Sequence, residues 1–517
     1  MIKISKYIFS AILASLICSC TSDLLDRSPL DSLSPGTFYG NESECKMGLM
    51  GIYSSLQPIA TPNFWYQLDF MSDNNYCQDS WQGSKEFGEW VQNSSSWAAS
   101  ARWTQDYRTI VRVNTFIDNM NNATVDGSVK TQMIAEAKFL RAFSYADLIS
   151  FYGDVPLILE PQTMEGALVS RTAKSTVLDA VIKDLDEAAA VLPQKYSGGD
   201  VGRATKGAAL AVKAKTLLYN EKWSDAATVA KQVMDLGAYS LFKDYAGLFE
   251  EANENNSEVI FDIQYIKTLQ HQPWPSACIS FTNWPTPNVT ADLINSYYMT
   301  NGLPITDNTS GYNDQNPFVN RDPRLAATVI LPGSKMGSVT YIPATDQVPC
   351  GARPRKYADI GSSDPDNYSI NTIVLRYADI LLMRAEALIE SGNTGQEVYD
   401  LIDQVRARVN MPKIESVEGK GLSKEQLRSI LRHERRVEFC LEGTRYNDML
   451  RWKDQSLVHD VYGYAIAKLS NPASPSTWVF EQVKKETRQF DSAKGWLWPI
   501  PQVEMQNNKN LTQNPGY

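Results

Sequence analysis

The chain has 517 residues, 43% of them hydrophobic and 21% charged, which is enough for one large globular domain or two ordinary ones. The formal net charge is −10, and Lys and Arg do not gather into a basic stripe along the sequence. Both observations argue against a nucleic-acid partner, because phosphate binding depends on clustered cations that release counterions.

The N-terminus has the pattern of an export signal. Lys3 and Lys6 precede an apolar segment, 7–17, that is too short to span a bilayer. No other apolar run in the sequence reaches the roughly 18 residues that a membrane span requires. We therefore expect an exported chain that is anchored to a membrane and does not span it.

The signal ends in "LICSC", where the small Ser19 precedes Cys20 as in a bacterial lipobox. This pattern predicts a lipoprotein signal peptide over residues 1–19, acylation of Cys20, and a tether over residues 20–40. The alternative is ordinary signal-peptide cleavage, which would leave Cys20 as a free thiol.

The other cysteines do not form a disulfide framework or a metal site. They are an odd and widely scattered set: Cys45, Cys77, Cys278, Cys350 and Cys440. A disulfide framework needs an even number at regular spacings, and a zinc site needs ligands closer together than these cysteines or the three histidines. We predict no cofactor. Structural calcium stays open, because "SSDPDNYS" at 362–369 offers oxygen ligands, but it lacks EF-hand spacing and an ordinary turn is the better interpretation.

A tryptophan-rich stretch, "WQGSKEFGEWVQNSSSW", runs from Trp81 to Trp97 with neither helical nor strand periodicity, and Trp65 and Tyr66 precede it. Core tryptophans normally sit in apolar periodic runs, so these rings are candidates for ligand contact. For any single ring, packing remains the more common role. Trp97 and Trp103 favour packing, because a helical pattern begins there.

Two amphipathic helices are expected next. Apolar residues recur with a period of 3.6 from Met133 to Phe151, and the pattern is closed by Gly153. A second stripe extends from Leu178 to Leu192 and is closed by a proline. Both patterns predict helices that face a core.

Two helix pairs then predict tetratricopeptide-like units. Residues 206–236 form one helix, a turn at "NEKW" and a second helix, and residues 373–409 repeat the design with a turn at "ESGN". Stacked pairs of this kind bury a continuous core and present a face to another protein. Helical packing without a partner is equally compatible with the pattern.

A loop-rich lobe is predicted between the pairs, from residue 255 to about 364. It is rich in Pro, Gly, Asn and aromatic residues, with Trp274 and Trp284 bracketed by prolines that preclude a long helix. The predicted fold is therefore mostly α, with helical pairs as a scaffold for an aromatic-rich lobe. We place the N-terminal helical region at 41–254 and the C-terminal region at 255–517, in one compact unit.

Near the C-terminus, Ser423 and Gln426 form a capping-box pattern that opens an amphipathic helix. Glu434 falls on its apolar face, where a carboxylate must be paired. The partners that we expect from local sequence are Arg435, Arg436, Arg445 and Arg451. A catalytic glutamate is the alternative, but no second carboxylate or base lies at a defined spacing, so we favour a structural ion-pair network.

Several motifs together resemble the SusD/RagB family. They are "RYADILLMRAEALIE", "HERRVEFCLEGTRYNDMLRW", "DPRL" at 322–325, the terminal "WLWPIPQVEMQNNKNLTQNPGY" and the lipoprotein start "CTSDLLDRSPLD". The resemblance implies a surface-exposed outer-membrane lipoprotein of Bacteroidota that binds oligosaccharide or polysaccharide and is not an enzyme. It also implies a SusC-like TonB-dependent transporter as partner, with the helical pairs facing the transporter and the lobe facing outward.

In this context the aromatic residues are predicted to bind sugar. A ring plane complements the C–H face of a sugar, while carboxylates and amides accept hydrogen bonds from its hydroxyls. By position, we assign stacking to Trp81, Trp274 and Trp284, with Trp65 and Tyr66 nearby, and hydroxyl binding to Asp73 and Asn74.

Two other functions stay open at this stage. Peptide capture, as in RagB-like lipoproteins, would replace the aromatic platform with a groove that pairs backbone. A surface glycosidase would need two carboxylates about 5 to 9.5 Å apart across the scissile bond. No motif supports the glycosidase.

Overall fold

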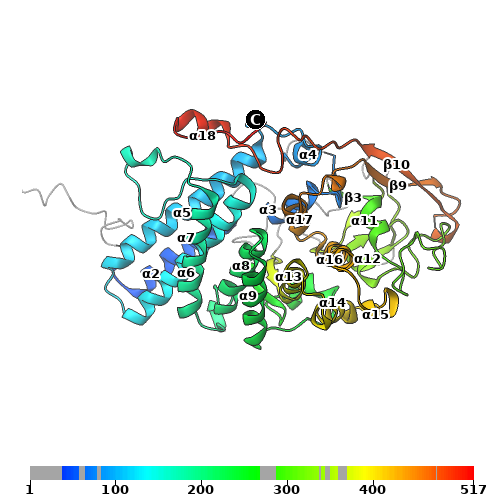
Figure 1. Cartoon of the computed structure of the whole chain (residues 1–517), viewed down its shortest axis with the longest axis horizontal. Helices are drawn as coiled ribbons and strands as arrows, with labels where there is room; N and C mark the ends of the chain where they lie inside the picture. Colours follow the sequence, from blue (N-terminus) through cyan, green and yellow to red (C-terminus); the bar gives the residue numbers. More distant parts are fainter. Residues whose placement is uncertain are drawn as a thin grey trace, which may run out of the picture.

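A computed structural model describes residues 38–57, 64–78, 83–267, 287–336, 339–343, 350–358, 369–472 and 474–517. Helices dominate this part of the chain (Figure 1). The described α-helices are α2 (Glu42–Tyr53), α3 (Phe64–Phe70), α4 (Ser84–Gly88), α5 (Trp97–Asn122), α6 (Gly127–Tyr152), α7 (Lys174–Val191), α8 (Lys206–Tyr219), α9 (Trp223–Asp235), α11 (Ala291–Ser296), α12 (Pro323–Thr328), α13 (Tyr377–Glu390), α14 (Gln396–Arg408), α15 (Ile414–Val417), α16 (Lys424–Phe439), α17 (Thr444–Trp452) and α18 (Gln502–Asn507).

The strands are short and form two-stranded antiparallel ladders. They are β1 (Asn75–Cys77) with β3 (Pro287–Val289), β2 (Val259–Ile263) with β8 (Thr372–Arg376), β4 (Val329–Ile330) with β7 (Arg353–Pro354), β5 (Lys335–Met336) with β6 (Val339–Thr340), and β9 (Val461–Lys468) with β10 (Val479–Glu486). The β9–β10 hairpin lies at the end of the molecule opposite to α2 (Figure 1). The mostly helical fold predicted from sequence is confirmed.

The N-terminal helices form one packed layer. Helix α6 packs against α5 on one side and α7 on the other, and the three lie side by side (Figure 1). Asp126 caps the start of α6 by accepting hydrogen bonds from the N–H groups of Ser128 and Val129, and Gly153 ends it at φ +73°. Both amphipathic helices predicted here, over 133–151 and 178–192, are confirmed.

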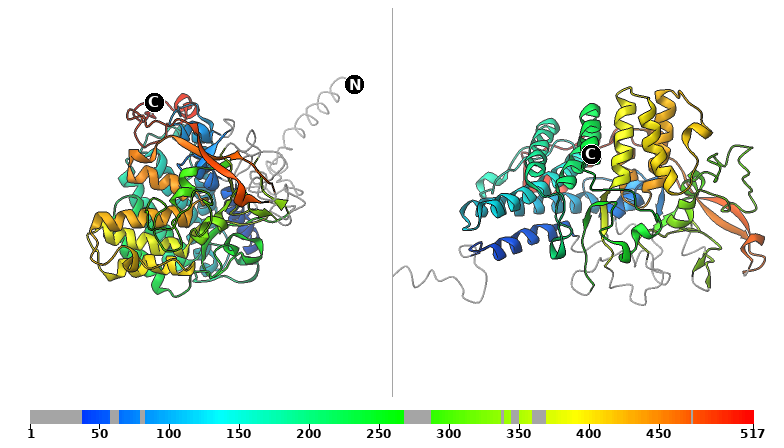
Figure 2. Two further views of the ribbon diagram at one scale, coloured as in Figure 1. Left: turned by 90° about the vertical axis from the view of Figure 1, so that its right-hand side faces the viewer. Right: turned by 90° about the horizontal axis from the view of Figure 1, so that it is seen from below.

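The first predicted helix pair is α8 and α9, which pack closely on each other and on α13. Both helices carry small buried residues, including Ala208, Ala211, Ala226 and Ala230. Small side chains let helix axes approach, so the alanine-rich sequence has a direct packing reason. The pair α13 and α14 stands beside α8 and α9 (Figure 2).

The second pair begins later than the sequence pattern suggested. Residues 372–376 form strand β8, which pairs with β2, and the helix starts only at Tyr377. Ile373 and Val374 are β-branched, and the backbone partner supplied by β2 favours the extended conformation. The helix after the capping box, α16, ends at Phe439, and Leu441 takes a left-handed φ of +65° before α17.

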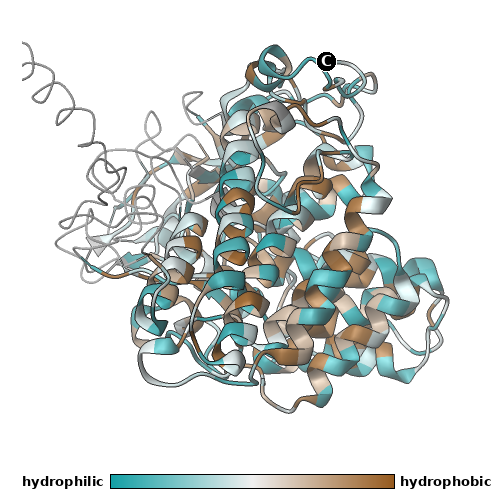
Figure 3. Ribbon diagram, turned by 90° about the vertical axis from the view of Figure 1, so that its left-hand side faces the viewer, coloured by the Kyte–Doolittle hydropathy of each residue, from teal (hydrophilic) through white to brown (hydrophobic). Residues whose placement is uncertain are grey.

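The hydrophobic core crosses the predicted boundary at residue 254. One cluster of buried residues extends from Cys45 to Leu511 and includes Phe261, Leu375 and Trp498. A second cluster joins the loop-rich lobe to other segments, through residues such as Phe70, Val437 and Tyr464, and a third lies among α13, α14 and α16. Figure 3 shows hydrophobic and hydrophilic residues alternating along the helices, as expected for elements with one face in a core.

In the described part of the chain, no helix is both long and apolar enough to cross a membrane. The described cysteines, Cys45, Cys77, Cys350 and Cys440, are free and buried.

Candidate functional site

The ladder of β1 and β3 joins two segments that are far apart in the sequence. Asn75 lies opposite Val289, Tyr76 opposite Asn288, and Cys77 opposite Pro287. Because the strands are antiparallel, the chain leaves β1 at the same end of the ladder at which it enters β3. The segments beyond that end contain Trp81 on one side, and Trp274 and Trp284 on the other.

A third segment, residues 350–354, packs against β3. The N–H of Val289 donates to the carbonyl of Ala352 at 3.1 Å, and the N–H of Cys350 donates to Oδ1 of Asn288 at 3.3 Å. Gly351 has φ +74°, and a Cβ there would lie 1.9 Å from the carbonyl oxygen of Tyr464, so only glycine fits. We call β1, β3 and residues 350–354 together the loop base.

The acceptor-rich run beside the loop base is buried. Asp73 is 3% exposed, and its carboxylate accepts hydrogen bonds from Arg445 at 2.8 and 2.7 Å and forms an ion pair with Arg436 at 3.1 Å. Burial alone would raise the pKa of Asp73, but the two guanidinium groups outweigh it and lower that pKa below its ordinary value. Asn74 is fully buried, and its Oδ1 accepts from Arg436 at 2.9 Å.

This placement argues against the predicted role of Asp73 and Asn74 in binding ligand hydroxyls. Their acceptors already serve protein donors, and neither side chain reaches the surface. They attach the α3–β1 segment to α16 and α17. The arginine partners lie more than 360 positions away in the sequence, so local sequence could not reveal the pairing.

Asp69 lies in the same segment and is fully buried. Its carboxylate accepts a hydrogen bond from the N–H of Gly443, at the start of α17, and one from Asn74 at 3.4 Å. Burial raises the pKa of Asp69 to about 7, despite these hydrogen bonds, which favour the ionised form. This carboxyl group therefore changes charge near neutral pH.

Behind the loop base, α16 carries a buried ion-pair network. Glu434 is 1% exposed and accepts from Arg324 at 2.6 Å, with Arg406 at 3.8 Å. Glu438 contacts Arg324 at 3.0 Å and Arg376 at 2.6 Å, and pairs closely with Arg408. The three arginines hold the pKa of Glu438 well below its ordinary value, against the opposing effect of burial.

The structural interpretation of Glu434 is confirmed, but its partners differ from those predicted. Arg435 pairs instead with Asp379 and Asp448, Arg451 pairs with Glu386, and neither contacts Glu434. The actual partner, Arg324, comes from the "DPRL" motif 110 residues earlier. Residues adjacent in sequence point to different sides of a helix, so α16 distributes its charges among several partners.

Two other titratable groupings near α16 are structural. His433 stacks on Tyr298 at 3.9 Å, its Nε2 lies 2.7 Å from the carbonyl oxygen of Ser296, and burial lowers its pKa. Asp292, His459 and Asp73 approach closely enough to surround an ion. The guanidinium of Arg436, 2.6 Å from Asp292 and 3.1 Å from Asp73, already supplies the positive charge there.

The predicted ligand-binding aromatics are only partly within the described residues. Trp81, Trp274 and Trp284 lie outside them, as do Cys20 and residues 362–368 of the calcium candidate. Trp65 and Tyr66 belong to α3, which precedes the loop base. The packing predicted for Trp103 is confirmed, since it is 4% exposed, whereas Trp97 is 38% exposed at the start of α5.

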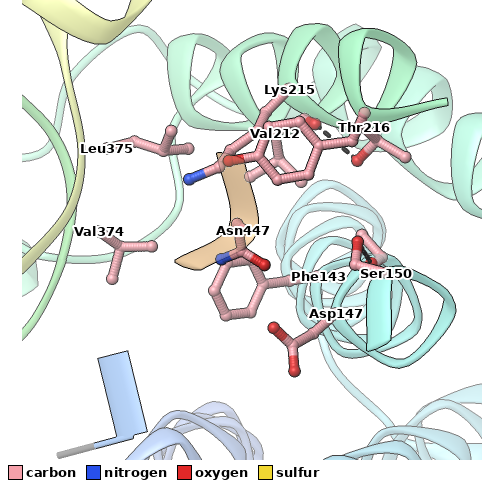
Figure 4. A pocket seen from close by; sticks show the side chains of 11 residues that line it. Phe143, Asp147, Ser150, Val212, Lys215, Thr216, Val374, Leu375 and Asn447 are labelled. Atoms are coloured by element: carbon pink, nitrogen blue, oxygen red, sulfur yellow. Dashed lines mark hydrogen bonds between the residues drawn. The ribbon is translucent and has the colours of Figure 1, made fainter. Parts of the chain in front are cut away.

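Two neighbouring spaces beside the helical layer were not predicted from the sequence. A chamber of about 50 Å³ lies among α6, α8, β8 and α17, and the ends of Lys215 and Asn447 point into it (Figure 4). It shares Ser150, Tyr219 and Asn447 with a larger cleft of about 340 Å³. Their lining residues come from helices far apart in the sequence, so no local motif signals either space.

Comparison with known families gives two matches. A family model described as "SusD family" matches residues 248–517, and one described as "Starch-binding associating with outer membrane" matches residues 24–218. Among curated relatives, SusD-like protein P25 of Formosa agariphila is 27% identical over 481 residues, which cover 84% of this chain and 88% of the relative.

Solved structures agree in fold over nearly the whole chain. A SusD-like carbohydrate-binding protein of Bacteroides fragilis superposes with a TM-score of 0.82 at 28% identity, covering 92% of this chain and 100% of the other. A laminarin-binding SusD-like protein superposes with a TM-score of 0.72 at 25% identity, covering 93% and 100%.

Proposed function

Because the chain belongs to the SusD family, we propose that it is a non-catalytic, surface-exposed lipoprotein of the outer membrane that binds glycan. The captured oligosaccharide or polysaccharide passes to a SusC-like TonB-dependent transporter. Cys20 carries the lipid that anchors the protein. Two relatives of similar fold are described as carbohydrate-binding and laminarin-binding, and one matched family model is described by starch binding and association with the outer membrane.

The loop base is the observation that carries this proposal. Three residues separate Cys77 from Trp81 in the sequence, and two separate Trp284 from Pro287, while Cys77 and Pro287 lie opposite each other. The proposal therefore places both rings near one end of the ladder, on a common site with Trp274. Aromatic planes held on a fixed base bind the face of a sugar ring with little loss of conformational entropy.

The arrangement of carboxylates supports binding without catalysis. Glu434 and Glu438 are buried and engaged by arginines, which hold them in fixed hydrogen bonds. A glycosidase needs one carboxylic acid that protonates the leaving group and a second carboxylate across the scissile bond, both in contact with the sugar. Glu434 and Glu438, which lie beneath the surface, do not meet that requirement.

Calorimetric titration of the mature protein with neutral oligosaccharides derived from starch, fructan, hemicellulose and host glycans tests the proposal. We expect saturable binding of one class and no new reducing ends after prolonged incubation with it. Release of reducing ends would contradict the non-catalytic assignment. Failure of every glycan, together with retention of peptides in a pull-down, would favour a peptide-capturing lipoprotein of the RagB type.

A further inference from the structure

A cleft of about 340 Å³ opens in the helical part of the molecule, among elements other than those of the loop base. Four segments line it: the start of α7, residues 220–222 between α8 and α9, the end of α17, and residues 496–497. This volume is within the range of about 300–1,000 Å³ that is typical of small-ligand sites. We call it the basic cleft.

The basic cleft carries net positive charge, and its lysines come from three separate segments. Lys174 comes from α7, Lys222 from the α8–α9 connection, and Lys453 from the end of α17. Glu221 is the one acidic residue among its described lining residues, and it pairs with Lys453 at 3.6 Å with both side chains more than 60% exposed. Exposed pairs of that kind contribute little free energy, so an anion can compete with Glu221 for Lys453.

The remaining lysines have no carboxylate partner within the described chain. The side chains of Lys174 and Lys222 form no ion pair with a described residue. Asp154 accepts a hydrogen bond from the backbone N–H of Lys174 at 2.8 Å, but not from its ammonium group. Arg451, a fourth cation in the lining, is already engaged by Glu386 at 2.5 and 2.7 Å and by Asp448 at 2.7 Å. The charge of Arg451 is therefore balanced, whereas the charge of the lysines is not.

The position of Lys174 is unfavourable for the fold alone. It lies in the first turn of α7, where the helix dipole already contributes partial positive charge and acidic residues are preferred. Burial lowers the pKa of Lys174, and the nearby charge of Lys453 lowers it further, although Glu221 and Asp154 act in the opposite direction. Binding an anion would relieve this repulsion.

The walls of the cleft suit an anion that is attached to a ring. Trp496 is half-buried, lines the cleft, and is held edge-on to Trp90 at 5.4 Å. Asn447 is 7% exposed, and its amide donates one long hydrogen bond, at 3.4 Å, to the carbonyl of Gly443. Its side chain is directed into the chamber of about 50 Å³ that adjoins the cleft (Figure 4).

We propose that the basic cleft is a second binding site of this protein, for a small oxyanion, carboxylate or sulfate, borne on a sugar ring. Lys174, Lys222 and Lys453 hold the anionic group through charge-assisted hydrogen bonds, and Trp496 packs against the ring. The cleft does not include the loop base, so it operates independently of the neutral-glycan site proposed above.

Calorimetric titration of the mature protein with sodium glucuronate, sodium sulfate and glucose, at constant ionic strength, tests this inference. We expect saturable 1:1 binding of glucuronate, weaker binding of sulfate that competes with it, and no binding of glucose. Lys174→Gln and Lys453→Gln should each weaken glucuronate binding at least threefold, and Lys453→Arg should retain it. Lys468→Gln, which removes an exposed lysine on β9, is the matched control and should change nothing.

Two results would overturn the inference: no saturable heat with glucuronate up to roughly 10 mM, or equal weakening by Lys468→Gln. Sulfate binding as tightly as glucuronate would refute the contribution of the sugar ring. Melting curves of each variant check folding. Failure of the neutral-glycan proposal is distinguishable, because Trp81→Ala should leave glucuronate binding intact and Lys174→Gln should leave neutral-oligosaccharide binding intact.

Discussion

Cys77 lies opposite Pro287 in the β1–β3 ladder, although the two are far apart in the sequence, so the chain leaves β1 and enters β3 at the same end of the ladder. The first prediction concerns the rings. Trp81→Ala and Trp284→Ala should each weaken binding of the cognate oligosaccharide by up to about tenfold, since stacking contributes about 0.5–1.5 kcal/mol per ring beyond area burial. If both rings contact one ligand, the double variant should deviate from additivity.

Titration calorimetry and melting curves measured on the same samples decide this prediction. The control is Trp103→Ala, because Trp103 is 4% exposed and its truncation should cost about 3–5 kcal/mol of stability without a specific effect on affinity. If the Trp81 and Trp284 variants behave like the Trp103 variant, with lower melting temperatures and unchanged affinity, then both rings belong to the core.

The second prediction concerns Arg324, which donates to Asp322, Glu434 and Glu438 and is 1% exposed. Arg324→Met should lower the free energy of unfolding by on the order of 3–5 kcal/mol, because it removes the close cation of buried Asp322 and Glu434. Urea denaturation measures the change. Lys231→Met, which breaks an exposed ion pair with Asp235, is the control and should leave the midpoint unchanged. If both variants unfolded at similar urea concentrations, burial of the ion pair would not determine its contribution to stability.

The third prediction concerns pH. The pKa of Asp69 is about 7 in the folded protein and about 3.8 when unperturbed. Between these values the unfolded chain has released a proton that the folded protein keeps, so this group makes the free energy of unfolding fall as pH rises from about 4 to about 7. Asp69→Asn removes the titration and keeps an acceptor for Gly443.

We therefore expect the stability of Asp69→Asn, relative to the native sequence, to increase between pH 4.5 and pH 8. Each pKa unit corresponds to about 1.4 kcal/mol. Urea denaturation at a series of pH values measures this difference. A relative stability that is constant with pH, or that falls as pH rises, would show that the pKa of Asp69 is not raised.

The fourth prediction concerns the anchor. Cys20→Ala should release the protein from membranes into the soluble fraction, because acylation of this cysteine is the attachment that we propose. Fractionation of cells that lack the transporter measures the distribution. The signal peptide over residues 1–19 stays unchanged, so export itself should continue. Detergent-dependent retention of the variant in membranes would contradict the assignment.

The fifth prediction concerns the transporter. Asp225→Lys and Lys231→Glu reverse exposed charges on α9 and should reduce co-purification with the neighbouring SusC-like barrel, since charge complementarity orients partners at an interface. Lys468→Glu, on β9, should leave co-purification unchanged. Pull-down from gently solubilised outer membranes, with melting curves to confirm folding, provides the measurement. Equal recovery with all three variants would remove α9 from the proposed interface.

The sequence alone determined the elements whose signals are local. Periodicity and an end signal at Gly153 located α6, small residues marked the contact of α8 and α9, and the pair Ser423 and Gln426 located the start of α16. These features depend on residues within one or two helical turns, where backbone hydrogen bonding and the position of one apolar face settle the outcome. For the same reason the sequence also indicated that Glu434 must be paired.

Only the tertiary structure decided which charged groups pair and which polar groups are buried. Glu434 pairs with Arg324 and not with the arginines beside it in the sequence. Asp73 belongs to a polar run that resembles an exposed loop, yet it is buried and paired with Arg445. The β1–β3 ladder and the basic cleft are likewise formed by segments that are far apart in the sequence, so no local pattern predicts them. Ion pairs, ladders and clefts between distant segments depend on how the helices pack, because a side chain finds its partner only after the core has fixed the distance between them.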